Sequence, residues 1–211
     1  MDTSPEGWIV AKNENIKLHE QFLETMQRHK DVDVEIFPLS PIPLLIHVGT
    51  LISDTVPATV YQYDREQEIW VTNKPRDSQQ AQVLILDSPL TSKDDSNILV
   101  VAVSVSALID SKDINEVIDV PFDLLEVKIE NPEIDKVLYR EDLKLIQKYF
   151  RKSVETQLQK KRYREIHLFY SGPAGLAVEV GRSINSRMWP DVVLYQYNAR
   201  SVPRYQKTFK V

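Results

Sequence analysis

The segment Ser171-Gly172-Pro173-Ala174-Gly175 carries the residue types best suited to holding an anion. It follows an apolar run and precedes a helical pattern, so we expect it where a parallel strand ends and its helix begins. A helix N-terminus presents unpaired backbone N–H groups and a positive dipole end, and glycine lets an anion or a base approach closely. A plain strand-to-helix turn with proline near the first helical position is the alternative interpretation.

Two serines and two tyrosines are further candidates for ligand contact. Ser104 and Ser106 end the run VVAVSVS, so we expect their hydroxyls at the same carboxyl edge of the sheet, although both also suit a plain strand end. Tyr63 and Tyr197 end two other predicted strands, where an aromatic face can stack on a base. Core packing is the alternative fate of a strand tyrosine.

Four arginines lie close in sequence to these elements and can pair with phosphates through their guanidinium groups: Arg182, Arg187, Arg200 and Arg204. Any one of them alone suits a surface charge equally well. The segment Leu39-Ser40-Pro41-Ile42-Pro43 holds the place in the first part of the chain that Ser171 and its neighbours hold in the second, but it lacks the glycines. Two such sites facing one another would form a composite pocket, and Ser40 is its candidate contact.

Catalytic and metal-binding motifs are missing from the sequence. There is no GxSxG, GxxxxGK[ST], GxGxxG after a strand, or HExxH pattern. The chain has no cysteine, and its four histidines lie far apart, which disfavours a metal site. His47 and His167 fit better as packed residues than as catalytic ones. We therefore predict no catalytic residues, no metal and no cofactor.

Two segments of the chain share one pattern at a shift of 132 residues, which indicates an internal duplication. Residues 34–53 read VEIFPLSPIPLLIHVGTLIS, and residues 166–185 read IHLFYSGPAGLAVEVGRSIN. Six positions are identical: Phe37/Phe169, Pro41/Pro173, Leu44/Leu176, Val48/Val180, Gly49/Gly181 and Ile52/Ile184. After a two-residue length difference, ATVYQYD (58–64) meets VVLYQYN (192–198) with the Tyr-Gln-Tyr triplet in register.

Each repeat reads as strand, helix, strand with short connections, which predicts a right-handed crossover between parallel strands. In the second half, residues 97–109 suit a central strand, residues 122–129 another strand, and Arg140–Arg164 a covering helix. Before its repeat unit, the first half offers only a strand at 7–11 and a helix at 16–28. We predict an α/β fold of two Rossmann-like halves with mainly parallel sheets, the first half abbreviated, spanning residues 1–90 and 97–211.

Composition is that of a globular protein, with 42% hydrophobic and 27% charged residues and a net charge of −5. Residues 1–96 carry 8 basic and 16 acidic side chains, whereas residues 97–211 carry 18 and 15. The acidic total disfavours duplex DNA. No apolar run reaches the roughly 20 residues of a membrane helix, and the start MDTSPEGW lacks a secretory pattern, so we expect a cytoplasmic protein with no membrane partner.

The residues Ile166–Phe169, Ser171–Ala174, Leu176-Ala177, Gly181 and Val193–Tyr197, with Leu99–Ser106 as opening strand, resemble the signature of SAVED domains. The resemblance covers residues 97–211 and, through the repeat, 34–70. It implies two fused CARF-like halves that bind a cyclic oligonucleotide, typically a cyclic tri- or tetra-adenylate, in CBASS or type III CRISPR antiphage defence. It also implies ligand-driven head-to-tail self-association that activates an effector. No effector domain is recognisable here, so we expect either a separate effector protein or an effector that has been lost or removed from this chain.

The resemblance thus predicts a non-enzymatic sensor that binds cyclic oligoadenylate at Ser104, Ser106, Ser171, Gly172, Pro173 and Tyr197. Two alternatives stay open: a ring nuclease that cleaves the messenger, and a scaffold subunit that has lost ligand binding. The abbreviated first half favours the scaffold and leaves room for a partner or a second protomer to complete the pocket.

Overall fold

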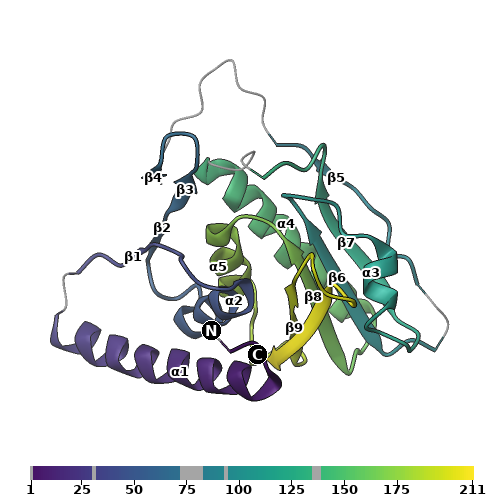
Figure 1. Ribbon diagram of the computed structural model, residues 1–211, viewed down its shortest axis with the longest axis horizontal. Helices are drawn as coiled ribbons and strands as arrows, with labels where there is room; N and C mark the ends of the chain where they lie inside the picture. The colour runs from purple at the N-terminus through teal and green to yellow at the C-terminus, as the bar shows by residue number, and fades with distance from the viewer. Residues whose placement is uncertain (1, 30–31, 72–82, 93–94, 135–138) are drawn as a thin grey trace.

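The computed structural model describes residues 2–29, 32–71, 83–92, 95–134 and 139–211, and its main feature is a six-stranded, mainly parallel sheet (Figure 1). The strand order is β10-β9-β8-β6-β7-β5. The strands span β5 (Ile85–Leu86), β6 (Ile98–Ser104), β7 (Asp123–Ile129), β8 (Glu165–Ser171), β9 (Val192–Tyr197) and β10 (Tyr205–Lys210). The four inner strands run parallel, and β5 and β10 close the edges in the antiparallel sense.

Strand β6 lies at the centre because its apolar run suits burial on both faces. All seven of its residues are buried. Leu99, Val101 and Val103 join the core cluster that includes the helices α4 (Arg140–Lys160) and α5 (Ala174–Ser183). Val100 and Ala102 point to the other face, toward the short helix α3 (Ser111–Asn115). The predicted central strand, its neighbour at 122–129 and the covering helix are confirmed.

The first half is a reduced version of the same unit. Strands β1 (Glu35–Ile36) and β2 (Thr59–Val60) pair in parallel across the helix α2 (Ile42–Ile52), as predicted for a strand–helix–strand crossover. A two-stranded hairpin follows, formed by β3 (Gln62–Asp64) and β4 (Ile69–Val71). Neither small sheet joins the large one. The described part of the first half thus contains the predicted strand–helix–strand unit and a hairpin after it.

Helices α2 and α5 pack against each other at two glycines (Figure 1). A Cβ atom added to Gly49 would lie 2.2 Å from the carbonyl oxygen of Val178, and one added to Gly181 would lie 2.0 Å from that of Ile46. Each glycine also approaches the Cα of the other. The two positions correspond in the internal repeat, so the duplicated units meet at an approximate two-fold axis. The identity Gly49/Gly181 therefore has a packing reason.

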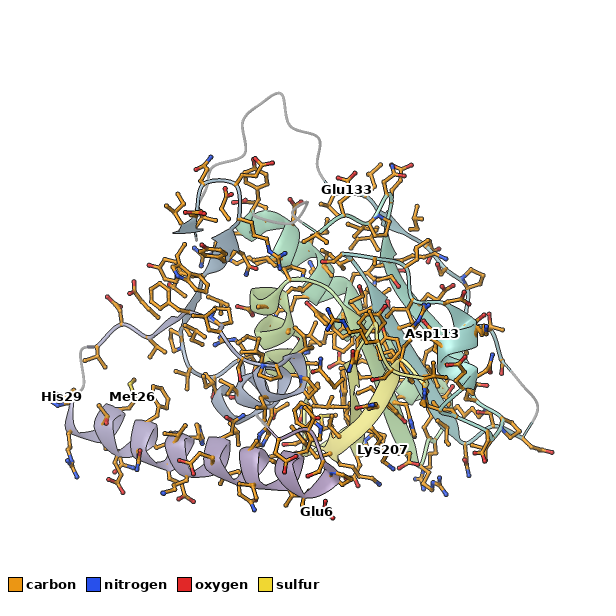
Figure 2. The ribbon with its side chains drawn as sticks, viewed as in Figure 1. Glu6, Met26, His29, Asp113, Glu133 and Lys207 are labelled. Carbon is orange, nitrogen blue, oxygen red and sulfur yellow. The ribbon has the colours of Figure 1, made fainter. Side chains whose placement is uncertain are left out.

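The strand predicted at residues 7–11 is wrong, because these residues lie in the long helix α1 (Pro5–Arg28). Ser4 Oγ accepts a hydrogen bond from Gly7 N at 3.1 Å, and Pro5 occupies the first helical position. Trp8 is buried beside the ring of Phe209 on β10, which anchors this end of the helix. The helix predicted for 16–28 is the distal part of α1, and Met26 and the C-cap His29 lie at the end of this helix that is far from the large sheet (Figure 2).

Two further features of the chain path differ from the sequence pattern. Strand β10 was not predicted, because only Tyr205 and Phe209 of its six residues are buried. Strand β5 pairs with β7, so the chain already contributes to the large sheet before residue 90.

Within the described ranges, no helix is long and apolar enough to span a membrane.

Candidate functional site

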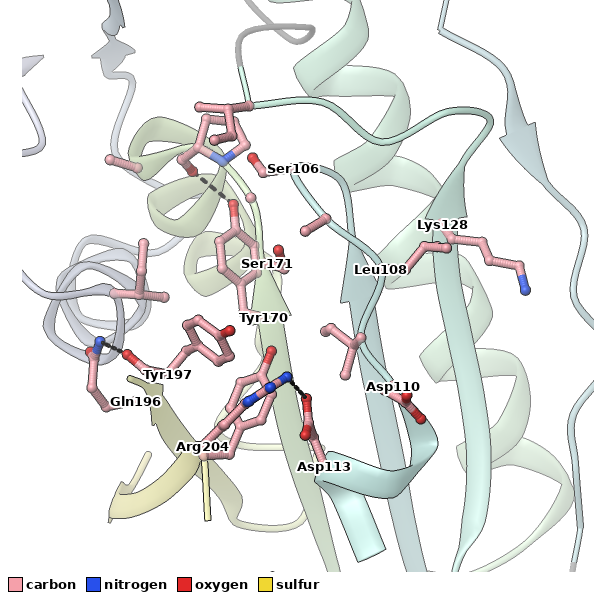
Figure 3. A pocket seen from close by; sticks show the side chains of 18 of the residues that line it. Ser106, Leu108, Asp110, Asp113, Lys128, Tyr170, Ser171, Gln196, Tyr197 and Arg204 are labelled. Carbon is pink, nitrogen blue, oxygen red and sulfur yellow. Dashed lines mark hydrogen bonds and ion pairs between the residues drawn. The ribbon is translucent and has the colours of Figure 1, made fainter. Parts of the chain in front are cut away.

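A cavity of about 1130 Å³ opens at the carboxyl edge of the large sheet, between the two halves (Figure 3). Its second-half wall includes the loop 106–111 after β6, the turn 171–174 after β8, alternate residues along β7, the end of β9 and the start of β10. Its first-half wall comes from Pro38, Leu39 and Ile42 around the start of α2 and from the β3–β4 hairpin. Helices α2 and α5 both begin at this cavity, which is the composite pocket expected from the repeat.

The turn after β8 is held in place by the ends of two neighbouring strands. The carbonyl oxygen of Ser171 accepts hydrogen bonds from Val105 N at 2.7 Å and Ser106 N at 2.9 Å. The hydroxyl of Tyr170 donates to the carbonyl oxygen of Pro173 at 2.7 Å, and burial raises the pKa of Tyr170, so the donor stays protonated. A Cβ atom at Gly172 would collide with the Tyr170 ring, which explains the glycine.

The first turn of α5 faces the cavity without a capping side chain. Pro173 occupies the N-cap position, and no side chain in the described part of the chain hydrogen-bonds the helix start. The backbone N–H groups at this end therefore have no capping side chain, and the positive end of the helix dipole lies at the cavity, which Ala174 lines, while the Gln62 side chain packs against Gly175 in the same turn. At α2 the same position is Pro41, and Pro43 removes one N–H group from the first turn. The α5 end is the better anion site of the two.

The loop after β6 is folded back over the sheet edge by a buried serine. Ser104 Oγ accepts a hydrogen bond from Ile109 N at 3.1 Å, and Ser104 itself is buried. Asp110 then caps α3 by accepting from Lys112 N at 2.8 Å. These two bonds fix the wall formed by residues 106–111.

Among the residues that the structure describes, basic and acidic side chains around the cavity are equal in number. The basic ones are Arg65, Lys128 and Arg204, and the acidic ones are Asp110, Asp113 and Glu126. Lys128 Nζ lies 3.1 Å from Glu126 Oε2, and Arg204 Nη1 lies 3.8 Å from Asp113 Oδ2 (Figure 3). With no excess of positive side chains, backbone dipoles must contribute much of any attraction for an anionic ligand.

Aromatic residues flank the cavity on both sides. Tyr63 and Trp70 come from the first-half hairpin, and Tyr197 and Tyr205 come from β9 and β10. Tyr205 is buried, and burial raises its pKa, with the neighbouring Asp113 carboxylate adding to the effect. These rings give the site flat apolar surfaces between its polar groups.

The structure brings together most of the residues predicted from the sequence. Seven of them line the cavity: Tyr63, Ser106, Ser171, Gly172, Pro173, Ala174 and Tyr197. Ser104 lies beneath the wall and supports it. Ser40 and Arg200 are exposed and are not among the lining residues. Sequence reasoning missed Asp113, because its helix is only five residues long, and Trp70, because β4 has three residues.

The arginines considered for phosphate binding separate into different environments. Arg204 lines the main cavity, whereas Arg182 lies in a smaller cavity of about 440 Å³ on another part of the surface. Arg182 Nη2 donates to the carbonyl oxygen of Val56 at 2.9 Å, which ties α5 to the first half. Arg187 is exposed beside Asn185.

None of the four histidines lines the main cavity. His167 Nδ1 lies 2.6 Å from Tyr195 Oη and its Nε2 lies 3.3 Å from Glu165 Oε1, and burial lowers its pKa. His47 is buried beside Asn15, with Nδ1 3.4 Å from Asn15 Nδ2. Both are packed residues. The residues that the structure describes contain no cluster of three or more metal-ligating side chains.

Comparison with known proteins places the fold and the family. The family model described as "SMODS-associated and fused to various effectors sensor domain" (SAVED) matches residues 17–211. No curated protein matches the chain. Among solved structures, the Acinetobacter baumannii Cap4 SAVED/CARF-domain receptor with the cyclic trinucleotide 3′3′3′-cAAA has a TM-score of 0.70 at 14% identity, covering 99% of this chain and 44% of the receptor.

Two further structures show the same fold. The Acinetobacter baumannii receptor with 2′3′3′-cAAA has a TM-score of 0.71 at 14% identity and the same coverage. The Moraxella osloensis Cap4 receptor has a TM-score of 0.68 at 13% identity, covering 99% of this chain and 43% of the receptor. The chain thus spans less than half the length of these receptors.

Proposed function

Because the chain belongs to the SAVED family, we propose that it is a sensor that binds a cyclic oligonucleotide of the cyclic oligoadenylate type. The observation that carries the proposal is the cavity itself, which both halves line and at which α2 and α5 begin. The fold shared with receptors solved with cyclic trinucleotides supports the choice of ligand.

Size and shape agree with a ligand of several nucleotides. At about 1130 Å³, the cavity slightly exceeds the usual range of small-molecule pockets, roughly 300–1,000 Å³. Its polar groups lie at the strand ends and its aromatic rings at the sides. A ring of three or four nucleotides requires this division, since its phosphates and bases face different directions.

The phosphates are assigned to the second half. Uncapped N–H groups at the start of α5 and the Ser106 and Ser171 hydroxyls provide donors, and Gly172 lines the cavity between Ser171 and Pro173. Arg204 adds a cationic group at the same cavity. Ser104 acts indirectly, by holding the loop that carries Ser106.

Signalling is proposed to follow from a change in association. A ligand that prefers an assembled state shifts the population toward that state, here a head-to-tail assembly or a complex with a separate effector protein. Light scattering with and without ligand tests this step independently of binding. A constant mass at saturating ligand, with no effector bound, would contradict the assembly step and leave the binding step standing.

A matched pair of substitutions at Ser106 tests the site. The change Ser106→Asp places a carboxylate in the cavity, whereas Ser106→Asn has nearly the same size and no charge. We expect Ser106→Asp to weaken binding of cyclic triadenylate at least tenfold by repulsion of the phosphates, and Ser106→Asn to bind within a fewfold of the unsubstituted protein.

Isothermal titration measures both affinities, and circular dichroism checks the fold of each variant. Equal affinities for the two variants would show that the ligand phosphates do not lie near this wall. Chromatography of the ligand after long incubation separates a sensor from a ring nuclease, because a sensor returns the ring intact.

A further inference from the structure

The internal repeat extends beyond the segment visible in the sequence, into an aromatic hairpin that follows each unit. After the first unit, β3 pairs with β4 in the antiparallel sense, and Tyr63 stands opposite Trp70. After the second unit, β9 pairs with β10 in the same sense, and Tyr197 stands opposite Tyr205. Tyr63 and Tyr197 are the last residues of the two Tyr-Gln-Tyr triplets.

The two aromatic pairs have nearly the same geometry. The ring centroids of Tyr63 and Trp70 lie 5.3 Å apart at 60°, and those of Tyr197 and Tyr205 lie 5.1 Å apart at 57°. Tyr63 is 45% exposed and Tyr197 is 42% exposed. All four residues line the main cavity, two from each half. Each tyrosine is therefore supported by a second ring and keeps a free face.

The first tyrosine of each triplet makes packing contacts and a hydrogen bond within the protein. Tyr61 donates its hydroxyl to Glu35 Oε1 at 2.8 Å and stacks on Phe37 with centroids 4.3 Å apart. Tyr195 is buried and lies 2.6 Å from His167 through its hydroxyl. Internal packing thus accounts for the first tyrosine of each triplet, and it leaves the second tyrosine half exposed at the cavity.

We propose that Tyr63 and Tyr197 form two equivalent base-stacking subsites, related by the approximate two-fold axis that passes near Gly49 and Gly181. This inference rests on the proposed function and specifies how that site holds its ligand. An aromatic face stacks on any base, and a partner ring set at a steep angle holds that face in one orientation.

The two subsites hold two bases of a cyclic ring. The wall 106–111 follows β6, and among the first-half residues that the structure describes no strand corresponds to β6. The site is therefore symmetric in its stacking surfaces and asymmetric in its polar wall. In a ring of three nucleotides, the third base faces this wall.

Substitutions at the two tyrosines test the inference. We expect Tyr63→Ala and Tyr197→Ala each to weaken binding of cyclic triadenylate by about 5- to 150-fold, with the two losses equal within about threefold. The double variant should lose the product of the two factors. Tyr63→Phe and Tyr197→Phe keep the aromatic face and should bind within about twofold of the unsubstituted protein.

Leucine variants guard against an effect on folding, because leucine fills the position without offering an aromatic face. Tyr63→Leu and Tyr197→Leu should unfold at the normal temperature and still lose affinity. Unchanged binding by either alanine variant, or a loss confined to one tyrosine, would overturn the equivalence of the subsites. If the unsubstituted protein binds no ring, the proposed function fails first and this inference fails with it.

Discussion

Adding one methyl group at Gly181 is expected to destabilise the protein, although alanine is the better helix former. In an unconstrained helix interior, Gly→Ala stabilises by about 1 kcal/mol. At Gly181 the new Cβ would lie 2.0 Å from the carbonyl oxygen of Ile46, well inside van der Waals contact. The obstacle is backbone, so α2 and α5 must move apart.

Overpacking of this kind costs about 1–3 kcal/mol and occasionally more. Close contact with main-chain atoms places Gly181→Ala at the upper end, so we expect a net loss of about 2 kcal/mol after the gain in helix propensity. With a urea slope of roughly 2–3 kcal/mol/M for a chain of this size, the unfolding midpoint should fall by about 0.7–1 M.

Urea unfolding followed by circular dichroism measures this shift, and a double-variant cycle identifies its cause. Gly49→Ala should show a similar loss, because its Cβ would lie 2.2 Å from the carbonyl oxygen of Val178. The double variant should lose less than the sum, since the two helices separate only once. An unchanged or raised midpoint for Gly181→Ala, or strictly additive losses, would refute the close crossing of α2 and α5.

Three further outcomes follow from the structure. Ser104→Ala removes the acceptor for Ile109 N at 3.1 Å, so we expect a loss of about 1–2 kcal/mol in urea unfolding and weaker ligand binding; an unchanged midpoint would contradict the role of Ser104 in holding the wall. Burial, with Lys12 nearby, lowers the pKa of His47 to about 4, so the unfolded state takes up the extra proton between pH 6.5 and 4 and stability falls as the pH falls through this range. The melting temperature of His47→Gln should therefore drop less between pH 7 and pH 4.5 than that of the unsubstituted protein, and an equal drop would contradict the assignment. If Arg204 contacts a phosphate, Arg204→Met should make the fall of log affinity with log salt concentration less steep by roughly one unit of slope. An unchanged slope would show that Arg204 does not contact a phosphate.

The large sheet was predictable because its strands carry strong patterns. The uninterrupted apolar run at 98–104 suits only a strand covered on both faces, and the structure places it at the centre of six strands. The repeat also predicted the parallel pairing of β1 with β2, although each strand has only two residues. Both predictions depend on the placing of apolar residues along the chain, which follows from their burial in the core.

The errors arose where a helix cap or a tertiary contact outweighs strand propensity. Residues 7–11 contain Trp8, Ile9 and Val10, which suit a strand by propensity, yet the Ser4 cap and the Trp8 contact with Phe209 favour a helix. Strand β10 has an exposed, polar majority and forms because β9 offers it an edge.

The candidate site was predictable in its glycine turn and incomplete in its opposite wall. The turn at 171–174 has a local signature, because a few consecutive residues determine where a helix starts and which backbone groups it exposes. Trp70 and Asp113 reach the cavity from a three-residue strand and a five-residue helix, which leave no periodic signal. Their positions depend on how the two halves pack.

Direct titration of the purified protein with cyclic triadenylate tests the central claim, with cyclic tetra-adenylate and linear triadenylate as comparison ligands. We predict that the protein binds a cyclic ring of one size saturably, with one ring per cavity. Ser106→Asp should abolish or strongly weaken this binding, and Ser106→Asn should keep it. Absence of heat with every ring at ligand concentrations up to about 1 mM, where even weak binding is measurable, would contradict the assignment of the cavity as a cyclic-oligonucleotide site.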